Sequence, residues 1–351
     1  MNSYQDSTAA AIVDHWALLP EIAPLAYQVH LMNRGRSRPL YLRIETVNTC
    51  NNLCVICAYR DQERPKTIMA MDVFKKAVDD YVALGGGFLS FTPLVGDAFL
   101  DRHLIARLKF LEGVPEIKEL GVTTNAAMAH RFDNDVLRYI VGRFGKISIS
   151  IYGIDNDEYQ KMTGRSTFVR MKEGIRRIVE SSQHEIQLEF RLLNKRTRDQ
   201  LLDWLEVEVF QGGDWRKLVR INSAITDYAN WGIYDEVNTP LPADARWFPV
   251  QRHEHRKQCL IPIFACIVYS DGNVSFCPCD NFNDTPELRL GNIMRASLAD
   301  MYNSPRAVEL WDWERFGTPE FCKNCTFHIP VSRAHDDPSL LSDPHQMVGA
   351  G

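Results

Sequence analysis

Residues 50–57 read Cys50-Asn51-Asn52-Leu53-Cys54-Val55-Ile56-Cys57, which spaces three cysteines as C-x3-C-x2-C. The preceding run, residues 40–47, alternates apolar and polar side chains and predicts a strand that ends just before the thiols. Three thiolates on a short loop can hold three irons of a [4Fe–4S] cluster and leave the fourth iron open to an outside ligand. The alternatives are three buried thiols, or part of a zinc site, whose ligands usually come as paired C-x2-C knuckles.

The composition limits the classes of protein and partner. At 351 residues and 45% hydrophobic, the chain can bury one large core or two smaller ones. A net charge of −5 and a pI near 6.1 give no electrostatic reason to expect nucleic acid or an anionic membrane as partner. No apolar run approaches the roughly 18 residues of a membrane span, and the N-terminus lacks the order of a signal peptide. We predict a cytoplasmic protein.

The cysteines fall into two groups. Three of the nine lie at 50–57, none lies between 58 and 258, and six lie at 259–325. An odd number of cysteines in a reducing compartment favours metal sites over a disulfide framework.

From residue 39 to 226, strand-like and helix-like segments alternate, which predicts an α/β fold with a parallel sheet and crossover helices. The strands are expected near 40–48, 88–95, 117–125, 146–152, 185–193 and 217–225, and the helices near 71–84, 98–112, 133–143, 167–181 and 197–209. Six such units indicate an open, partial (β/α)6 barrel of the TIM type.

The strands also alternate strictly between apolar and polar side chains. Ser148 and Ser150 alternate with isoleucines, and Glu189 and Arg191 alternate with Leu188 and Phe190. Strands covered by helices on both faces normally read as continuous apolar runs, so the pattern predicts a polar chamber inside the barrel. The alternative is a one-sided sheet that faces water. By the same alternation Glu189, Arg191, Arg43 and Glu45 point toward the chamber, and they are the candidates for a base if a substrate is oxidised there; the pattern does not choose among them.

The triplet at 50–57 resembles the signature of the radical S-adenosylmethionine (SAM) enzymes, and the resemblance extends from about residue 39 to 329. It implies a partial barrel in which the open iron chelates the amino and carboxylate groups of SAM. It also implies that an electron from the cluster cleaves SAM to a 5′-deoxyadenosyl radical. The residue before the third cysteine is often aromatic in the family and lies near the adenine, whereas here it is Ile56.

Further elements resemble those with which the family contacts SAM. Gly96 and Asp97 stand in the place of the Gly-Gly-Glu motif, where a carboxylate would receive the methionine ammonium; taken alone they would be read as a turn. Ala126 replaces the glycine of a Thr-Asn-Gly element. The remaining candidates are Asn125 in that element, Ser148 and Ser150 on the ribose-contacting strand, and Arg165 for the SAM carboxylate, with a surface arginine as the alternative for Arg165.

The C-terminal cysteines form a second constellation. Residues 270–273 predict a hairpin turn that brings Cys259 and Cys277 together, and a C-x2-C knuckle supplies Cys322 and Cys325 after a helix expected over 297–309. Four thiolates so arranged can enclose another [4Fe–4S] cluster, with zinc as the alternative. The arrangement resembles the SPASM/twitch extension of radical SAM enzymes, a small α+β cysteine-rich auxiliary-cluster domain.

These observations predict five segments along the chain. They are a helical lead-in at 1–38, the barrel at 39–227, a linker at 228–258, the auxiliary domain at 259–330 and a disordered tail at 331–351.

The expected function is abstraction of a hydrogen atom from a C–H bond of a carbohydrate-like small molecule or a peptide. An auxiliary cluster would assist a net oxidation or bond formation, and a flavodoxin- or ferredoxin-type protein would supply electrons. One alternative is an epimerase in which Cys279 or Cys266 returns a hydrogen atom, although both thiols could equally be buried spectators. The other alternative is a non-catalytic iron–sulfur or zinc protein.

Overall fold

The structure is a computed structural model that describes residues 39–91, 94–248, 258–259, 261–279, 281–326 and 328. The predictions for the lead-in at 1–38 and the tail at 331–351 lie outside the described residues. Within the described part, no helix is both long enough and apolar enough to cross a membrane.

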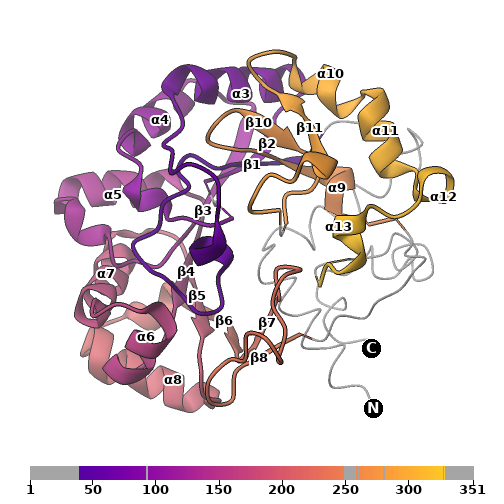
Figure 1. Cartoon of the computed structure of the whole chain (residues 1–351). Helices are drawn as coiled ribbons and strands as arrows, with labels where there is room; N and C mark the ends of the chain where they lie inside the picture. Colours follow the sequence, from indigo (N-terminus) through magenta and orange to yellow (C-terminus); the bar gives the residue numbers. More distant parts are fainter. Residues whose placement is uncertain are drawn as a thin grey trace, which may run out of the picture.

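The first half of the chain forms the predicted parallel sheet (Figure 1). Adjacent strands pair in parallel in the order β1 to β6, which follows the order of the sequence. The strands are β1 (Tyr41–Ile44), β2 (Gly87–Phe91), β3 (Ile117–Thr124), β4 (Lys146–Ile151), β5 (Ile186–Arg191) and β6 (Val219–Ile225). The prediction of an open barrel of six strand–helix units is confirmed.

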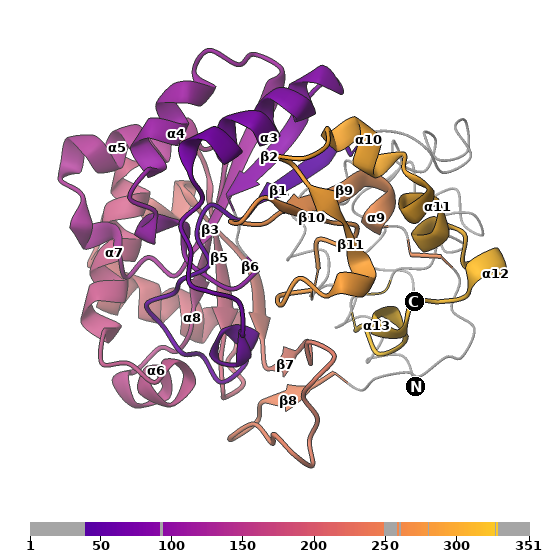
Figure 2. The same ribbon diagram turned by 45° about the horizontal axis from the view of Figure 1, so that its top comes forward.

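Helices cover the outer face of this sheet (Figures 1 and 2). They are α3 (Met71–Ala83), α4 (Leu104–Leu111), α5 (Asn134–Arg143), α6 (Asn156–Thr163), α7 (Phe168–Ser181) and α8 (Arg198–Trp204). The helix expected over 98–112 is instead a short 3-10 turn, η2 (Ala98–Leu100), followed by α4. The break arises because Asp101 ends the turn and accepts a hydrogen bond from the His103 amide at 2.8 Å. At the other end of the barrel α8 continues as a π-helix, η4 (Leu205–Phe210).

The outward-facing strand residues build the main core. Leu42, Ile149 and Leu188 are fully buried in one cluster with the inner faces of the helices. The residues next to them in sequence face the opposite side of the sheet, since successive side chains of a strand alternate. The inner face is thereby left to polar side chains.

The C-terminal part extends the same sheet beyond β1. β9 (Ala265–Val268) pairs in parallel with β1, and β10 (Asn273–Ser275) and β11 (Arg289–Asn292) follow in antiparallel order. The full order is therefore β11-β10-β9-β1-β2-β3-β4-β5-β6. The predicted turn joins β9 to β10, with Gly272 at φ +87° in the left-handed region that glycine tolerates. The cysteine-rich segment is thus joined to the barrel by backbone pairing.

Short helices cover the hairpin on the side opposite α5–α8 (Figure 2). They are α9 (Ile261–Phe264), α10 (Leu298–Tyr302), α11 (Pro305–Trp311), α12 (Trp313–Phe316) and α13 (Glu320–Lys323). The prediction of a single helix over 297–309 is wrong, because the structure has two helices there, α10 and α11. Ser304 caps α11 and Pro305 occupies its first turn, where the missing amide hydrogen costs nothing.

The segment predicted as a linker carries a small two-stranded sheet. β7 (Asp227–Tyr228) pairs in parallel with β8 (Arg246–Trp247). Its aromatic side chains pack into a second hydrophobic cluster with Cys54 and Ile56. This segment therefore covers the loop of the first three cysteines.

Candidate active site

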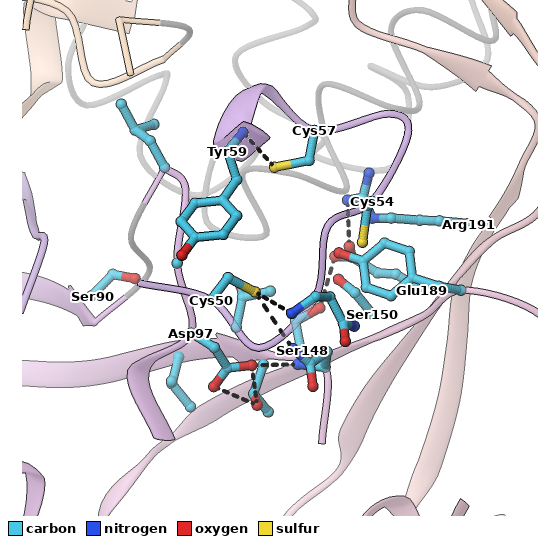
Figure 3. Close-up of a pocket in the computed structure, with 18 of the residues that line it drawn as sticks. Cys50, Cys54, Cys57, Tyr59, Ser90, Asp97, Ser148, Ser150, Glu189 and Arg191 are labelled. Atoms are coloured by element: carbon cyan, nitrogen blue, oxygen red, sulfur yellow. Dashed lines mark hydrogen bonds and ion pairs between the residues drawn. The ribbon is translucent and has the colours of Figure 1, made fainter. Parts of the chain in front are cut away.

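A cavity inside the barrel collects polar side chains from β1 to β5 and from the loop after β1 (Figure 3). The predicted polar chamber is therefore present. Of the predicted site residues, those that line it are Arg43, Cys50, Cys54, Cys57, Gly96, Asp97, Asn125, Ser148, Ser150, Glu189 and Arg191.

Backbone contacts fix the loop that carries the three thiols. The Leu53 amide donates to the Thr163 carbonyl at 2.9 Å, and the Val55 amide donates to the Met162 carbonyl at 2.8 Å. Trp231 Nε1 donates to the Ile56 carbonyl at 2.9 Å from the other side. The loop is thus held between the end of α6 and the β7–β8 segment.

The three sulfur atoms face the cavity together with backbone and side-chain donors. The Asn52 amide lies 3.5 Å from Cys50 Sγ, and the Tyr59 amide lies 3.4 Å from Cys57 Sγ. Burial raises the pKa of all three thiols, that of Cys57 to about 11, so it is a bound metal that would hold them as thiolates. N–H donors to sulfur are a usual feature of iron–sulfur sites and tune their potential.

The donor set fits a cluster with one open iron. No cysteine or histidine other than the three thiols lines the cavity among the described residues. Nor do three histidine, cysteine or acidic side chains in the described ranges converge closely enough to hold a single metal ion. A mononuclear zinc site, whose ligands must surround a single ion, is therefore disfavoured. In a [4Fe–4S] cluster each cysteine binds a different iron, so the sulfur atoms lie farther apart.

Asp97 lines the cavity and also bonds to neighbouring elements of the barrel. Its carboxylate accepts hydrogen bonds from the Phe99 amide at 2.9 Å, the Asn125 amide at 2.9 Å and the Thr124 hydroxyl at 3.0 Å. Burial raises the pKa of this carboxyl group. The carboxylate predicted to receive the methionine ammonium thus also joins the turn after β2 to the end of β3.

Asn125 lies where that junction meets the cysteine loop. Its Nδ2 donates to Asn51 Oδ1 at 2.9 Å and lies 3.8 Å from Cys50 Sγ. Ala126, in the glycine's place of the Thr-Asn-Gly element, adopts φ +62°, a left-handed conformation that glycine tolerates better than alanine. The side chain of Asn125 is therefore aimed at the first cysteine by a strained turn.

Ser148, Glu189 and Arg191 also line the cavity and form a connected network. The Ser148 hydroxyl donates to Glu189 Oε1 at 2.7 Å, and Arg191 Nη2 donates to Oε2 at 2.7 Å (Figure 3). Although burial opposes the guanidinium charge, the Glu189 carboxylate and nearby tyrosines raise the pKa of Arg191 overall. This pair supplies a carboxylate beside a fixed positive charge within the chamber.

Several predicted residues lie outside the cavity. Arg165 does not line it, and its Nε donates to the Asn51 carbonyl at 2.9 Å, so the side chain clamps the cysteine loop. Glu45 is buried in an ion pair with Arg64 at 2.5 Å rather than facing the chamber. Cys266 is fully buried beside Leu42 on the outer face of the sheet, and burial alone raises the pKa of its thiol.

The C-terminal cysteines lie around the hairpin. Cys277, Cys279 and Cys322 are buried, and Cys259 and Cys325 are partly buried. The Cys279 amide lies 3.4 Å from Cys277 Sγ, and the Cys325 amide donates to the Cys322 carbonyl at 3.4 Å in a tight turn. Cys279 does not line the cavity.

The sequence did not reveal the aromatic wall of the cavity. Tyr152, Tyr228 and Trp231 line it beside Ile56, and Glu119 and Lys146 line it at the start of β3 and β4. Tyr152 could have been found from strand alternation, but Tyr228 and Trp231 lie in the segment predicted as a linker, where no pattern indicates which side chains face the cavity. Trp231 brings an aromatic side chain next to Ile56, the position at which the family often has one.

Two protein-family models match this chain. The model of the radical SAM superfamily matches residues 44–206, and that of the SPASM iron–sulfur cluster-binding domain matches residues 259–326. Together they cover more than half of the chain. The chain is a radical SAM enzyme. The predicted family, the SAM-binding [4Fe–4S] cluster, SAM itself and auxiliary iron–sulfur binding are thereby confirmed.

Individual relatives of this radical SAM enzyme are distant. A GTP 3′,8-cyclase of Mannheimia succiniciproducens is 24% identical over 177 residues, which cover 49% of this chain and 51% of that protein. The chain thus matches only about half the length of such curated relatives.

Among solved structures, anSMEcpe with bound AdoMet has a TM-score of 0.55 at 15% identity, covering 88% of this chain and 100% of that one. SuiB of Streptococcus suis bound to S-adenosylmethionine has a TM-score of 0.55 at 13% identity, covering 89% and 78%. At these identities the likeness establishes the fold alone.

Proposed function

We propose that Cys50, Cys54 and Cys57 hold the SAM-binding cluster of this enzyme and that the cavity beside them is where a substrate C–H bond loses its hydrogen atom. The observation that carries the proposal is that these three thiols line one polar cavity without a further cysteine or histidine among its described lining residues. When bound there with SAM, the cluster would supply the electron that generates the 5′-deoxyadenosyl radical.

The chain's own residues would bind SAM around that open position. Gly96 and Asn125 line the cavity on the side of Cys50, and Ser148 and Ser150 line it from β4. Asn125 offers a side-chain amide, and the two serines offer hydroxyl groups that suit the ribose and carboxylate of SAM. Asp97 would act indirectly, because its carboxylate holds the Asn125 backbone in place.

Glu189 is the proposed base for the proton that accompanies substrate oxidation. It is almost fully buried, lines the cavity and is oriented by Ser148 and Arg191. A carboxylate held in place by two donors can take a proton without reorganising, and Arg191 places a positive charge beside it. Arg191 would also stabilise an anionic group of the substrate.

Net oxidation or bond formation assisted by an auxiliary cluster is the preferred outcome, with Cys259, Cys277, Cys322 and Cys325 as its proposed ligands. Epimerisation needs a thiol next to the substrate radical, but neither Cys266 nor Cys279 lines the cavity. Charged and hydroxyl-bearing lining residues suit a carbohydrate-like small molecule or a polar peptide segment. A flavodoxin- or ferredoxin-type protein is the proposed electron donor.

Anaerobic incubation of the reconstituted enzyme with SAM and dithionite tests this function. We expect 5′-deoxyadenosine to form, and we expect Cys54→Ala to abolish it together with the iron of the SAM-binding cluster. Cys266→Ala is the matched control, because it removes a buried thiol outside the cavity and should retain the activity. Equal product from Cys54→Ala and the wild type would contradict the ligand assignment.

A further inference from the structure

Arg43 contacts both the cavity and the cysteine-rich hairpin. Its side chain lines the cavity, and it is 2% exposed. Its Nη1 donates to the Pro278 carbonyl at 2.8 Å, and Pro278 lies between Cys277 and Cys279. One guanidinium group therefore spans the wall between the SAM chamber and the auxiliary cysteines.

The sheet itself fixes this position. Arg43 lies on β1, which pairs with β2 of the barrel on one side and with β9 of the hairpin on the other. Arg43 is opposite Ser90 on β2 and opposite Ile267 on β9. Because Ile267 also pairs with Ser275 on β10, the chain reaches Cys277 only two residues beyond that pair. The contact is thus set by strand register.

The surroundings of Arg43 are suited to an anionic cluster. Arg43 is buried, and its hydrogen bond to the Pro278 carbonyl places the guanidinium group beside the Cys277–Cys279 loop. Glu45, just after the end of β1, forms an ion pair with Arg64 instead. A [4Fe–4S] cluster with four thiolate ligands is negatively charged, and a buried cation nearby stabilises its more negative, reduced form.

We propose that Arg43 is a positioning residue that raises the reduction potential of the auxiliary cluster and holds the Cys277–Cys279 loop against the substrate chamber. This inference rests on the proposed function, in which Cys277 is a ligand of that cluster. A raised potential makes the auxiliary cluster the better electron acceptor of the two clusters, which is what a net oxidation of substrate requires.

The test is a redox titration monitored by electron paramagnetic resonance on the anaerobically reconstituted full chain. Arg43→Gln and Arg43→Met both remove the charge. Two neutral variants are used so that the test remains possible if one of them folds poorly. We expect both to shift the auxiliary-cluster potential to lower values, with a smaller shift for the SAM-binding cluster. Arg43→Lys keeps the charge and should restore most of the difference.

Lys146→Gln is the matched control, because it removes one positive charge from the same cavity lining. Lys146 lies on β4, three strand positions from β1, or about 14 Å along the sheet, so its removal should leave the auxiliary potential nearly unchanged. An auxiliary potential that is the same in Arg43→Gln, Arg43→Met and the wild type would overturn the inference. A shift as large in Lys146→Gln would also overturn it.

Failure of the proposed function has a different signature. Cys277→Ala should lose the auxiliary-cluster signal and its iron while the SAM-binding cluster remains. If Cys277→Ala keeps all of its iron, the ligand assignment is wrong, whatever the potentials of the Arg43 variants.

Discussion

At the scale of single residues, two polar side chains that were predicted to contact SAM bond to other parts of the protein. The Asp97 carboxylate accepts a hydrogen bond from the Asn125 amide, and the Arg165 guanidinium donates one to the Asn51 carbonyl. Both were expected to contact SAM directly. A motif fixes which residue type stands at a position, but the hydrogen-bond partners depend on neighbours far apart in the sequence.

The contribution of Trp231 to SAM binding can be measured directly. It lines the cavity beside Ile56 and donates a hydrogen bond to the Ile56 carbonyl. We expect Trp231→Ala to raise the Kd for SAM roughly tenfold, since an aromatic face and a hydrogen bond to the loop are worth about 1–2 kcal/mol together. Anaerobic equilibrium dialysis with labelled SAM measures this Kd.

Two further variants separate the parts of that effect. Trp231→Phe keeps a ring and loses the donor, so its Kd should fall between those of the alanine variant and the wild type. Trp215→Phe is the control, because Trp215 stacks on Phe210 near the start of β6 and does not line the cavity. An unchanged Kd in Trp231→Ala would show that the ring does not contact SAM.

At the scale of elements, α7 supports the turn that carries Asn125. Gly174 of α7 packs so closely on the Ala126 carbonyl that an added Cβ would clash with backbone atoms. We expect Gly174→Ala to destabilise the protein by about 1–3 kcal/mol, because the overlap must be relieved by moving the helix or the turn. The midpoint of thermal unfolding measures the change.

Gly142 of α5 provides the opposite case on the neighbouring helix. Nothing lies within 4 Å of the Cβ that alanine would add there. Gly142→Ala should therefore stabilise the protein by roughly 0.5–1 kcal/mol through the lower chain entropy of alanine. If both variants were destabilised equally, the close approach at Gly174 would not be the cause of the stability lost in Gly174→Ala.

Strands and helices were more predictable than the ends and breaks between them. The alternation of Ser148 and Ser150 with isoleucines placed β4 and its inward face correctly, because period-2 patterning reflects burial directly. The same rule correctly put Glu189 in the chamber but failed for Glu45, where β1 has ended and Arg64 captures the carboxylate. The break at Pro305 was also available from the sequence, since proline prefers the first turn of a helix.

At the scale of the whole molecule, the barrel and the cysteine-rich hairpin share one sheet. β1 is an inner strand whose two edges are occupied by β2 and β9. The sequence predicted the hairpin but not its partner, because parallel pairing of β9 with β1 joins residues more than two hundred positions apart. Side chains reinforce the joint, since Arg64 Nε donates to the Phe282 carbonyl at 2.9 Å and Ser270 donates to Glu45.

This shared sheet predicts that the barrel does not fold stably alone. A fragment of residues 1–248 would expose the β9-facing edge of β1, and the side chains of Arg43 and Glu45 would lose partners on the hairpin. An exposed edge next to a buried apolar strand favours aggregation. We expect this fragment to be largely insoluble when expressed alone, and co-expression with residues 258–351 to restore a soluble complex. Sedimentation and the iron content of the soluble fraction measure both outcomes. The control is the full chain with Cys322→Ala, which loses a proposed auxiliary ligand but keeps the sheet. A soluble 1–248 fragment that binds its own cluster and cleaves SAM would show instead that the hairpin is an independent addition to a complete barrel.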